Sequence, residues 1–194
     1  MAEDASRILA SALADDPFYR SITVDSGADA AARGACLDRY FRFSIEEGYG
    51  IGRVAIAAGE GAAIWVTSAD EALLEDARAR KQALFSDLLG VDGFSNYRRI
   101  VDGMEANLPR ELDPSAWYLS ILGVSARRRG AGIGGRLLAP VLADADAAAV
   151  PCFLETYNPL SLPFYRRLGF EISGTHVEPV TGAAYWVMIR AAAE

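Results

Sequence analysis

The sequence predicts an α/β fold in which helices flank a mixed sheet. Apolar residues recur at intervals of three and four over several long stretches, which is the period of a helix. Shorter apolar runs bounded by glycine or proline have the character of strands. The patterns follow the order helices, hairpin, helices, strand, helix, strand, helix, hairpin, which is typical of α/β architecture. With 194 residues and 52% hydrophobic content, we expect one buried core and a single domain over residues 1–194.

The first half of the chain places helices around one hairpin. The hairpin is predicted where the period changes, with its turn at Gly59-Glu60-Gly61. The two helices after it form an insertion too long for a loop, which is either a wall of a substrate site or a scaffold that covers the sheet. The expected elements are helices from residue 5 to Pro17 and over residues 29–47, a hairpin over residues 48–68, and helices over residues 70–89 and 94–108, separated by residues 90–93.

The second half is organised around a strand, a glycine turn and a helix. A continuous apolar run over residues 117–124 predicts the strand, and a helical pattern resumes at Gly132. A short helix beginning near Asn158 or Leu162 ends at Gly169, a residue favoured just after a helix. The other expected elements are a long helix over residues 132–148 and strands over residues 150–156, 170–173 and 184–190. The long helix is predicted to bury Ile133, Leu137, Leu138, Val141, Leu142 and Ala145.

Charge narrows the possible partners. The formal net charge is −7 and the pI is about 4.8, so neither nucleic acid nor an anionic membrane is expected as the main partner, because both would repel the chain. Against this acidic background, the triplet Arg127, Arg128 and Arg129 indicates a small anionic ligand. A solvated arginine cluster at a turn is the alternative interpretation.

The remaining composition favours a cytoplasmic protein without a metal. Cys36 and Cys152 lie far apart in apolar surroundings, which fits reduced thiols better than a disulfide or a metal site. The chain has one His, so a His-rich zinc site is excluded. Glu3 and Asp4 stand where a signal peptide would carry positive charge, and no apolar run is long enough to span a membrane.

Glycines follow the arginine triplet, and they point to a phosphate. Glycine lets the backbone approach a ligand closely, and the free N–H groups at the start of a helix attract phosphate. A P-loop needs a lysine after its glycines, and none is nearby. The dinucleotide fingerprint is literally present in Gly130, Gly132 and Gly135, with Glu155 as the ribose-binding acid. Against it, residues 125–129 separate the strand from the first glycine, and too few residues follow Glu155 for a doubly wound sheet.

The same turn resembles a known cofactor loop. Residues 124–135 read VSARRRGAGIGG and resemble the acetyl-CoA pyrophosphate loop, [RQ]-x-x-G-x-[GA], of the GNAT superfamily of N-acetyltransferases. Arg129, Gly132 and Gly134 occupy the pattern positions. A second motif, NPLSLPFYRRLGF over residues 158–170, resembles the asparagine and tyrosine-bearing helix of that superfamily. Two motifs in the right order make the resemblance more specific than either motif alone.

The resemblance extends over most of the chain. Residues 117–125 and 151–156, together with the second motif, look like the puromycin N-acetyltransferases and their relatives, and the hairpin over residues 52–67 is more weakly similar. The superfamily implies a mixed, mostly antiparallel sheet flanked by helices, with the cofactor cleft between two central parallel strands. Its usual first strand is not recognisable here, because the chain begins in what resembles the family's first helix.

The resemblance implies acetyl-CoA as co-substrate and no metal. The glycine loop would hold the diphosphate through backbone N–H groups, the arginines would add charge, and the last strand residues would pair with the pantetheine arm and offer an N–H to the thioester oxygen. The residues implied to bind acetyl-CoA are Leu122, Gly123, Val124, Arg127, Arg128, Arg129, Gly130, Ala131, Gly132, Ile133, Gly134, Gly135, Asn158 and Tyr165.

The resemblance also implies catalytic roles. In this family an amine attacks the acetyl group directly, and Tyr165 would protonate the departing CoA thiolate. A free thiol has a pKa of about 8.5 and a phenol of about 10, so this transfer is only mildly uphill. Glu155 is the best candidate for the base that deprotonates the amine, and pairing with a nearby arginine is the alternative. Tyr165 could instead pack beneath Phe170, and Asn158 either caps its helix or binds the cofactor.

Three classes of function remain open. The first is acetyl transfer to the primary amine of a small molecule, with an aminonucleoside antibiotic among the candidates, by a monomer or homodimer. The second makes a protein or peptide amine the acceptor, and the third is a non-catalytic acyl-CoA-binding module, against which an intact Tyr165 argues. The acceptor side is expected to be lined by residues 18–20, 40–49 and 84–104, which do not identify the amine.

Overall fold

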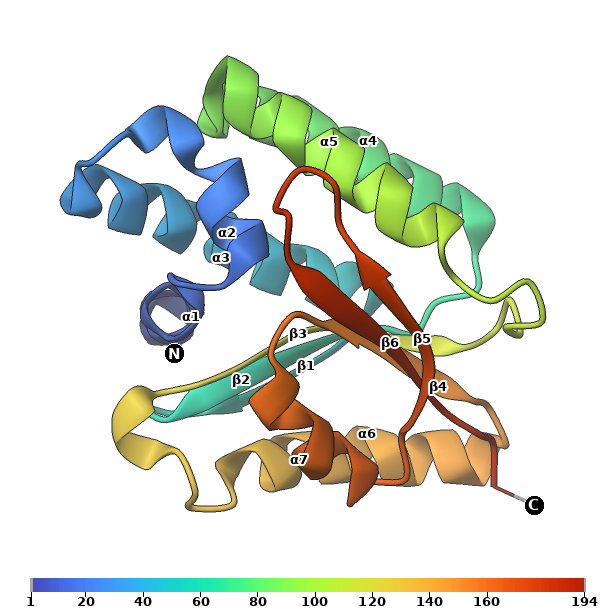
Figure 1. The fold of residues 1–194 in the computed structure, drawn as a ribbon. Helices are drawn as coiled ribbons and strands as arrows, with labels where there is room; N and C mark the ends of the chain where they lie inside the picture. Colours follow the sequence, from blue (N-terminus) through green and yellow to red (C-terminus); the bar gives the residue numbers. More distant parts are fainter. Residues whose placement is uncertain (1, 194) are drawn as a thin grey trace.

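The computed structural model describes residues 2–193 as a six-stranded sheet with helices on both faces (Figure 1). The strand order across the sheet is β1-β2-β3-β4-β6-β5. All neighbouring strands are antiparallel except β3 and β4, which are parallel. The predicted mixed, mostly antiparallel sheet is therefore confirmed. The strands are β1 (Gly52–Ala57), β2 (Gly61–Val66), β3 (Trp117–Val124), β4 (Cys152–Thr156), β5 (Glu171–Val177) and β6 (Ala184–Arg190).

Seven α-helices cover the two faces of the sheet unequally. Figure 1 shows α6 and α7 below the sheet and the other helices on its opposite side. The first described element is a helix, and no strand precedes it within residues 2–193. The helices are α1 (Ala2–Leu13), α2 (Pro17–Ile22), α3 (Ala30–Ile51), α4 (Glu71–Leu88), α5 (Gly90–Ala106), α6 (Ile133–Ala148) and α7 (Leu162–Arg166).

Strand alternation divides the core into two clusters. Successive side chains of a strand point to opposite faces of a sheet. Accordingly, Ala62 and Ile64 of β2 join the cluster under α1 to α5, whereas Ala63 and Trp65 join the cluster under α6 and α7. All six residues predicted for the inner face of α6 are buried, so this prediction is confirmed.

The parallel strands β3 and β4 are joined only at one end. Their pairing comprises Trp117 with Cys152 and Tyr118 with Phe153. Beyond Tyr118, β3 continues to Val124, still paired with β2 but with no registered partner on its β4 side within residues 2–193. The strands therefore diverge, and the backbone N–H and C=O groups on the inner edge of β3 remain available to a ligand.

The two helices predicted after the hairpin are present, but the predicted start of the second one is wrong. Residues 90–93 were expected to separate two helices, but α5 begins at Gly90. Gly90 has φ 75°, a left-handed conformation that turns the chain sharply after α4. The Asp25 carboxylate then accepts hydrogen bonds from the N–H groups of Asp92 and Gly93, at 3.0 and 3.3 Å. The start of α5 is thus capped by a residue far away in sequence.

Removing this distant cap should destabilise the fold. We expect Asp25→Ala to lower the free energy of unfolding by about 1 kcal/mol, since two N–H groups in the first turn of α5 lose their acceptor. Urea unfolding measures this change. Asp102→Ala, at an exposed position of the same helix, is the control and should change stability by less than about 0.5 kcal/mol. Equal effects in the two variants would contradict the capping role.

Candidate active site

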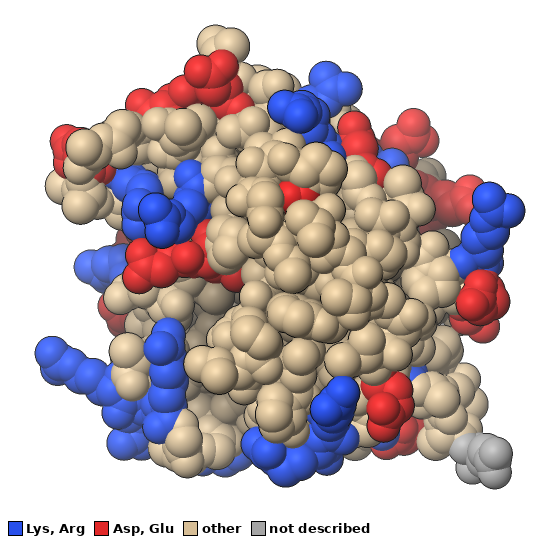
Figure 2. Space-filling view, viewed as in Figure 1, with Lys and Arg blue, Asp and Glu red and all other residues tan. Residues whose placement is uncertain are grey.

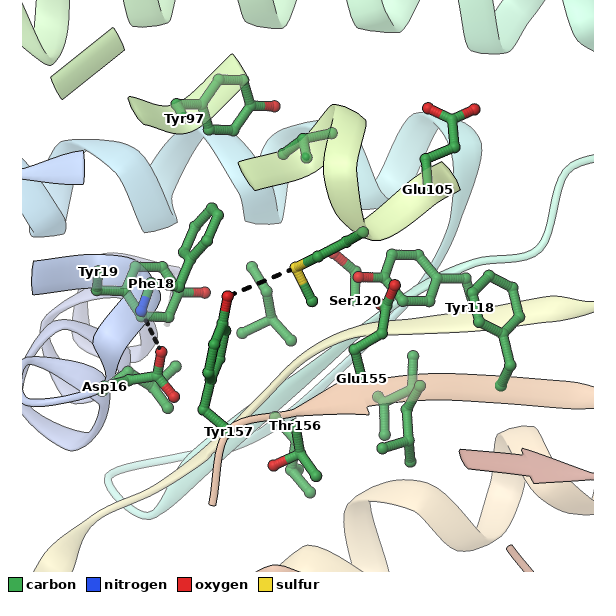
Figure 3. Close-up of a pocket in the computed structure, with 18 of the residues that line it drawn as sticks. Asp16, Phe18, Tyr19, Tyr97, Glu105, Tyr118, Ser120, Glu155, Thr156 and Tyr157 are labelled. Atoms are coloured by element: carbon green, nitrogen blue, oxygen red, sulfur yellow. Dashed lines mark hydrogen bonds between the residues drawn. The ribbon is translucent and has the colours of Figure 1, made fainter. Parts of the chain in front are cut away.

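The diverging strands open onto a cavity of about 410 Å³. Its wall is formed by side chains from both halves of the sequence. The first half contributes the α1–α2 junction, α3, α4 and α5 above the sheet, and the second half contributes β3, β4 and α7. Glu155 and Tyr165, the two predicted catalytic residues, both line this cavity. Figure 3 shows Glu155 of β4 beside Tyr118 and Ser120 of β3. The structure therefore brings Glu155 of β4 and Tyr165 of α7 to one cavity. Of the residues implied to bind acetyl-CoA, Leu122 and Tyr165 line this cavity, whereas the glycine loop over residues 124–135 lies outside its wall.

The carboxyl group of Glu155 is buried, and no basic side chain within residues 2–193 pairs with it. Its Oε2 atom is buried and has no hydrogen-bond partner within residues 2–193. Burial raises the pKa of Glu155 from its ordinary value of 4.5 to about 7, and interaction with the Tyr118 hydroxyl offsets only part of that rise. The predicted alternative, an ion pair with an arginine, is not formed in the described chain. A carboxyl group with a pKa near 7 can exchange a proton readily at neutral pH.

Tyr165 both packs in the core and faces the cavity. Its ring lies edge-on to Phe170, with the centroids 6.1 Å apart, and also contacts Phe164 at 5.0 Å. Burial, with a smaller contribution from the Asp16 carboxylate, raises the pKa of the Tyr165 hydroxyl above its ordinary value of 10.0. The hydroxyl is therefore protonated at neutral pH. Because of this raised pKa, proton transfer from Tyr165 to a thiolate is less favourable than transfer from a free phenol.

The glycine loop after β3 adopts a conformation that suits an anion. Gly130 and Gly132 have φ values of 80° and 74°, in the left-handed region that favours glycine. Gly132 is the N-cap of α6, so the N–H groups of Ile133, Gly134 and Gly135 begin the helix without intrahelical acceptors. These N–H groups and the positive end of the α6 dipole are features that attract an anion.

Arginines surround this loop in an otherwise acidic protein. Figure 2 shows positive side chains gathered over the loop between β3 and α6 and over α7. Glu60, in the β1–β2 turn, forms ion pairs with Arg128 and with Arg136, the latter at 3.5 Å. Arg129 instead donates to the Ala12 carbonyl near the end of α1, at 3.4 Å. The exposed arginines of these segments are Arg127, Arg128, Arg129, Arg136, Arg166 and Arg167.

Comparison with known proteins identifies the family. The model of the acetyltransferase (GNAT) family matches residues 71–170, which is more than half of the chain and includes β3, the glycine loop, α6, β4 and α7. The chain belongs to the acetyltransferase (GNAT) family. The family uses acetyl-CoA.

Relatives of this GNAT chain agree in fold. An uncharacterized N-acetyltransferase of Schizosaccharomyces pombe is 30% identical over 77 residues, which are 40% of this chain and only 31% of that protein. A Corynebacterium glutamicum structure, described as histone acetyltransferase HPA2 and related acetyltransferase, has 23% identity and a TM-score of 0.63, covering 98% of this chain and 90% of that one. An N-acetyltransferase from Staphylococcus aureus has 14% identity and a TM-score of 0.56, covering 96% of each chain.

Asn158 lies outside the cavity wall, between β4 and α7. Its Oδ1 accepts a hydrogen bond from the Leu160 N–H at 3.0 Å, so it caps the 3-10 turn Pro159–Ser161 that leads into α7. Of the two predicted roles of Asn158, the structure therefore contains the capping hydrogen bond. Asn158 as a residue is exposed.

The acceptor side of this GNAT site contains residues that sequence reasoning missed. Only part of the prediction that residues 18–20, 40–49 and 84–104 line it holds, for Phe18, Tyr19, Tyr40, Tyr97, Val101 and Met104. The missed residues come from the α1–α2 junction, from α4, and from β3, β4 and the residue after β4, because only tertiary packing brings them here. They are Asp16, Arg78, Lys81, Tyr118, Phe153 and Tyr157. The inserted helices α4 and α5 act as both wall and scaffold, since Phe85 and Ile100 are core residues.

Two observations concern other kinds of site. No group of three or more His, Cys, Asp or Glu side chains in residues 2–193 could hold a metal ion. Over the same described range, no helix is both long enough and apolar enough to cross a membrane.

Proposed function

We propose that this chain transfers an acetyl group from acetyl-CoA to the primary amine of a small molecule, by direct attack in a ternary complex. The observation that supports this most strongly is the divergence of β3 from β4 after Tyr118. It leaves a free strand edge, a glycine loop at the end of that strand, and a cavity that contains Glu155 and Tyr165.

The residues present fit acetyl-CoA. A Cβ added at Gly130 or Gly135 would meet nothing within 4 Å, so the loop faces open space. The α6 N–H groups would hold the diphosphate, with Arg127 and Arg128 beside it. The backbone of Leu122, Gly123 and Val124 would pair with the pantetheine arm along the free edge of β3. When bound, acetyl-CoA supplies the acetyl group as a thioester.

The proposed chemistry divides two proton transfers between two residues. Glu155, with its pKa near 7, accepts the proton from the attacking nitrogen directly or through water. Tyr165 gives its proton to the sulfur as the carbon–sulfur bond breaks and the carbon–nitrogen bond forms. The two cysteines do not line the cavity, and burial raises the pKa of both, to about 11 for Cys152. A cysteine acyl-enzyme is therefore not part of the proposal.

The size of the cavity supports a small acceptor. A volume of about 410 Å³ lies within the range typical of small-molecule sites, and part of it belongs to the acetyl end of the cofactor. The sequence resemblance to puromycin N-acetyltransferases makes an aminonucleoside one candidate acceptor. A peptide amine remains the second candidate, since acetyltransferases of proteins occur among chains of similar fold.

Release of the CoA thiol tests this proposal. Wild-type protein is mixed with acetyl-CoA and, in turn, with small amines that include puromycin and with a short peptide. We expect amine-dependent thiol release with small amines and weak release with the peptide. Faster release with the peptide would favour the second candidate, and NADH binding without acetyl-CoA binding would contradict the proposed cofactor.

A strained substitution in the loop should weaken cofactor binding. We expect Gly132→Ala to weaken acetyl-CoA binding at least fivefold and to lower stability by about 1 kcal/mol, because alanine disfavours φ 74°. Titration calorimetry and thermal unfolding measure the two effects. Gly182→Ala is the matched control: Gly182 has φ 65° and lies in the β5–β6 turn, with open space around it. It should lose similar stability and keep its acetyl-CoA affinity, and a loss of affinity there would contradict the loop's role.

A further inference from the structure

Asp16 is a carboxylate of the cavity wall that the proposed transfer does not use. Asp16 lies between α1 and α2, where its Oδ1 accepts the Phe18 N–H at 2.9 Å as the N-cap of α2. The N-cap aspartates of α3 and α4, Asp29 and Asp70, are both exposed. Asp16 is instead half-buried and faces the cavity. Burial raises its pKa from 3.8 to about 6, which reflects the cost of keeping a charge there.

Aromatic rings surround Asp16. The Phe18 and Tyr19 rings pack edge-to-face with centroids 5.1 Å apart, and Phe18 reaches Tyr97 of α5 at 6.2 Å. Figure 3 shows Asp16, Phe18 and Tyr19 on one side of the Tyr157 ring and Glu155 on the other. The Tyr157 hydroxyl meets the Met104 sulfur at 3.8 Å, so the ring spans the cavity from β4 to α5. These rings offer flat apolar faces to a ligand.

The charges of the cavity wall favour a cation. Its two basic side chains already have acidic partners: Lys81 pairs with Glu47, and Arg78 lies 3.9 Å from Glu105. Asp16 and Glu155 have no basic partner within residues 2–193, and none contributes to either carboxyl's pKa. A positive ligand would therefore gain from unneutralised carboxylates in a half-buried site, and from the faces of the rings as well.

We propose that Asp16 is a specificity-determining residue that binds a positively charged group of the acceptor, so that the preferred acceptors are small cationic amines carrying an aromatic ring. This inference rests on the proposed function, because it concerns the acceptor half of the same cavity. It assigns to Asp16 a role beyond capping α2. Anionic amines, purely aliphatic amines and peptides are the disfavoured classes.

The variant Asp16→Asn separates the two roles of this residue. Asparagine caps helices about as well as aspartate, so α2 keeps its cap while the cavity loses the charge. The probe is 1,4-bis(aminomethyl)benzene, which carries a second ammonium group besides the amine that reacts. It is titrated by calorimetry into wild-type and variant protein saturated with CoA. We expect its Kd to rise about tenfold in the variant, as for the loss of one charged contact. The Kd of acetyl-CoA should stay within about twofold of the wild type.

The matched control is Asp29→Asn, which makes the same change at the exposed N-cap of α3. It should leave the Kd of 1,4-bis(aminomethyl)benzene unchanged. An unchanged Kd in Asp16→Asn, or equal changes in both variants, would overturn the proposal. Thermal unfolding of the two variants shows whether the capping contribution is retained.

The wild-type protein gives an independent test that needs no variant. Its Kd and rate of acetylation are compared for 1,4-bis(aminomethyl)benzene, 1,6-diaminohexane, 4-(aminomethyl)benzoic acid and a short peptide. We expect 1,4-bis(aminomethyl)benzene to bind at least tenfold more tightly than 4-(aminomethyl)benzoic acid, in which a carboxylate replaces the second ammonium group, and more tightly than 1,6-diaminohexane, which lacks the ring. If acetyl-CoA binds but the aromatic cation has no advantage, this inference fails while the proposed function stands. If acetyl-CoA itself does not bind, both fail.

Discussion

Glu155→Gln is expected to lower kcat by about 10² to 10⁴, the usual contribution of a positioned general base. Glutamine has nearly the same shape but cannot accept the proton of the attacking nitrogen. In the wild type, kcat/KM should rise with pH and level off above about 7, where the carboxyl has lost its proton. The variant should lack this rise. A pH profile measured with one good acceptor, whose own ionisation is subtracted, checks both results.

The same substitution should stabilise the protein at alkaline pH. Folding raises the pKa of Glu155 from 4.5 to about 7, so the folded state holds its proton more tightly than the unfolded state. The stabilisation gained from the bound proton is complete below pH 4.5 and is lost as pH rises through 7. Glutamine avoids this loss, and we expect a gain of up to about 3 kcal/mol at pH 8 and none at pH 4.

Thermal unfolding at the two pH values measures this gain. Glu75→Gln, at an exposed position of α4, is the control and should change stability little at either pH. A variant that is inactive and also less stable at pH 8 would indicate that Glu155 is a structural carboxylate. Loss of activity with a gain in stability is the pattern expected of a functional residue held in an unfavourable environment.

The second large effect is expected at Tyr165. Tyr165→Phe should lower kcat by about 10² or more, because the sulfur loses its proton donor. The acetyl-CoA affinity should change less than fivefold. The phenylalanine ring keeps the edge-on contact with Phe170, so the fold should be preserved. Steady-state kinetics and acetyl-CoA titration give the two values.

Tyr49→Phe provides the control for this experiment. Tyr49 lies in α3 with 62% of its surface exposed, and it does not line the cavity. Removing its hydroxyl should change neither kcat nor KM. If Tyr165→Phe behaves in the same way, Tyr165 is a packing residue and another group protonates the sulfur.

The parts of the fold that could be predicted from sequence depend on local patterns. The helix α6 and its buried face were predictable because six apolar residues recur with helical spacing behind a glycine N-cap. The start of α5 was not, because its cap comes from Asp25, 67 residues earlier. The strand β5 continues to Val177, beyond the predicted residue 173, since pairing with β6 stabilises residues with little strand character of their own.

The parts of the candidate site that lie in or beside a sequence motif could be predicted from the sequence. Glu155, Tyr165 and the glycine loop follow from sequence, whereas the pKa of Glu155 depends on burial by many distant residues. Asp16 precedes a proline and has the pattern of an ordinary helix cap. Its place in the cavity wall follows only from the packing of α2 against α5, so no local signal distinguishes it from Asp29.

The fate of the acetyl group tests the central claim most directly. Protein is mixed with acetyl-CoA that carries an isotopic label in its acetyl group, with and without an amine acceptor, and mass spectrometry follows both the amine and the protein. Direct transfer in the cavity of Glu155 and Tyr165 predicts a labelled amine and an unlabelled protein at all times. Label on the protein that chases into the amine, or no amine-dependent loss of acetyl-CoA, would contradict it.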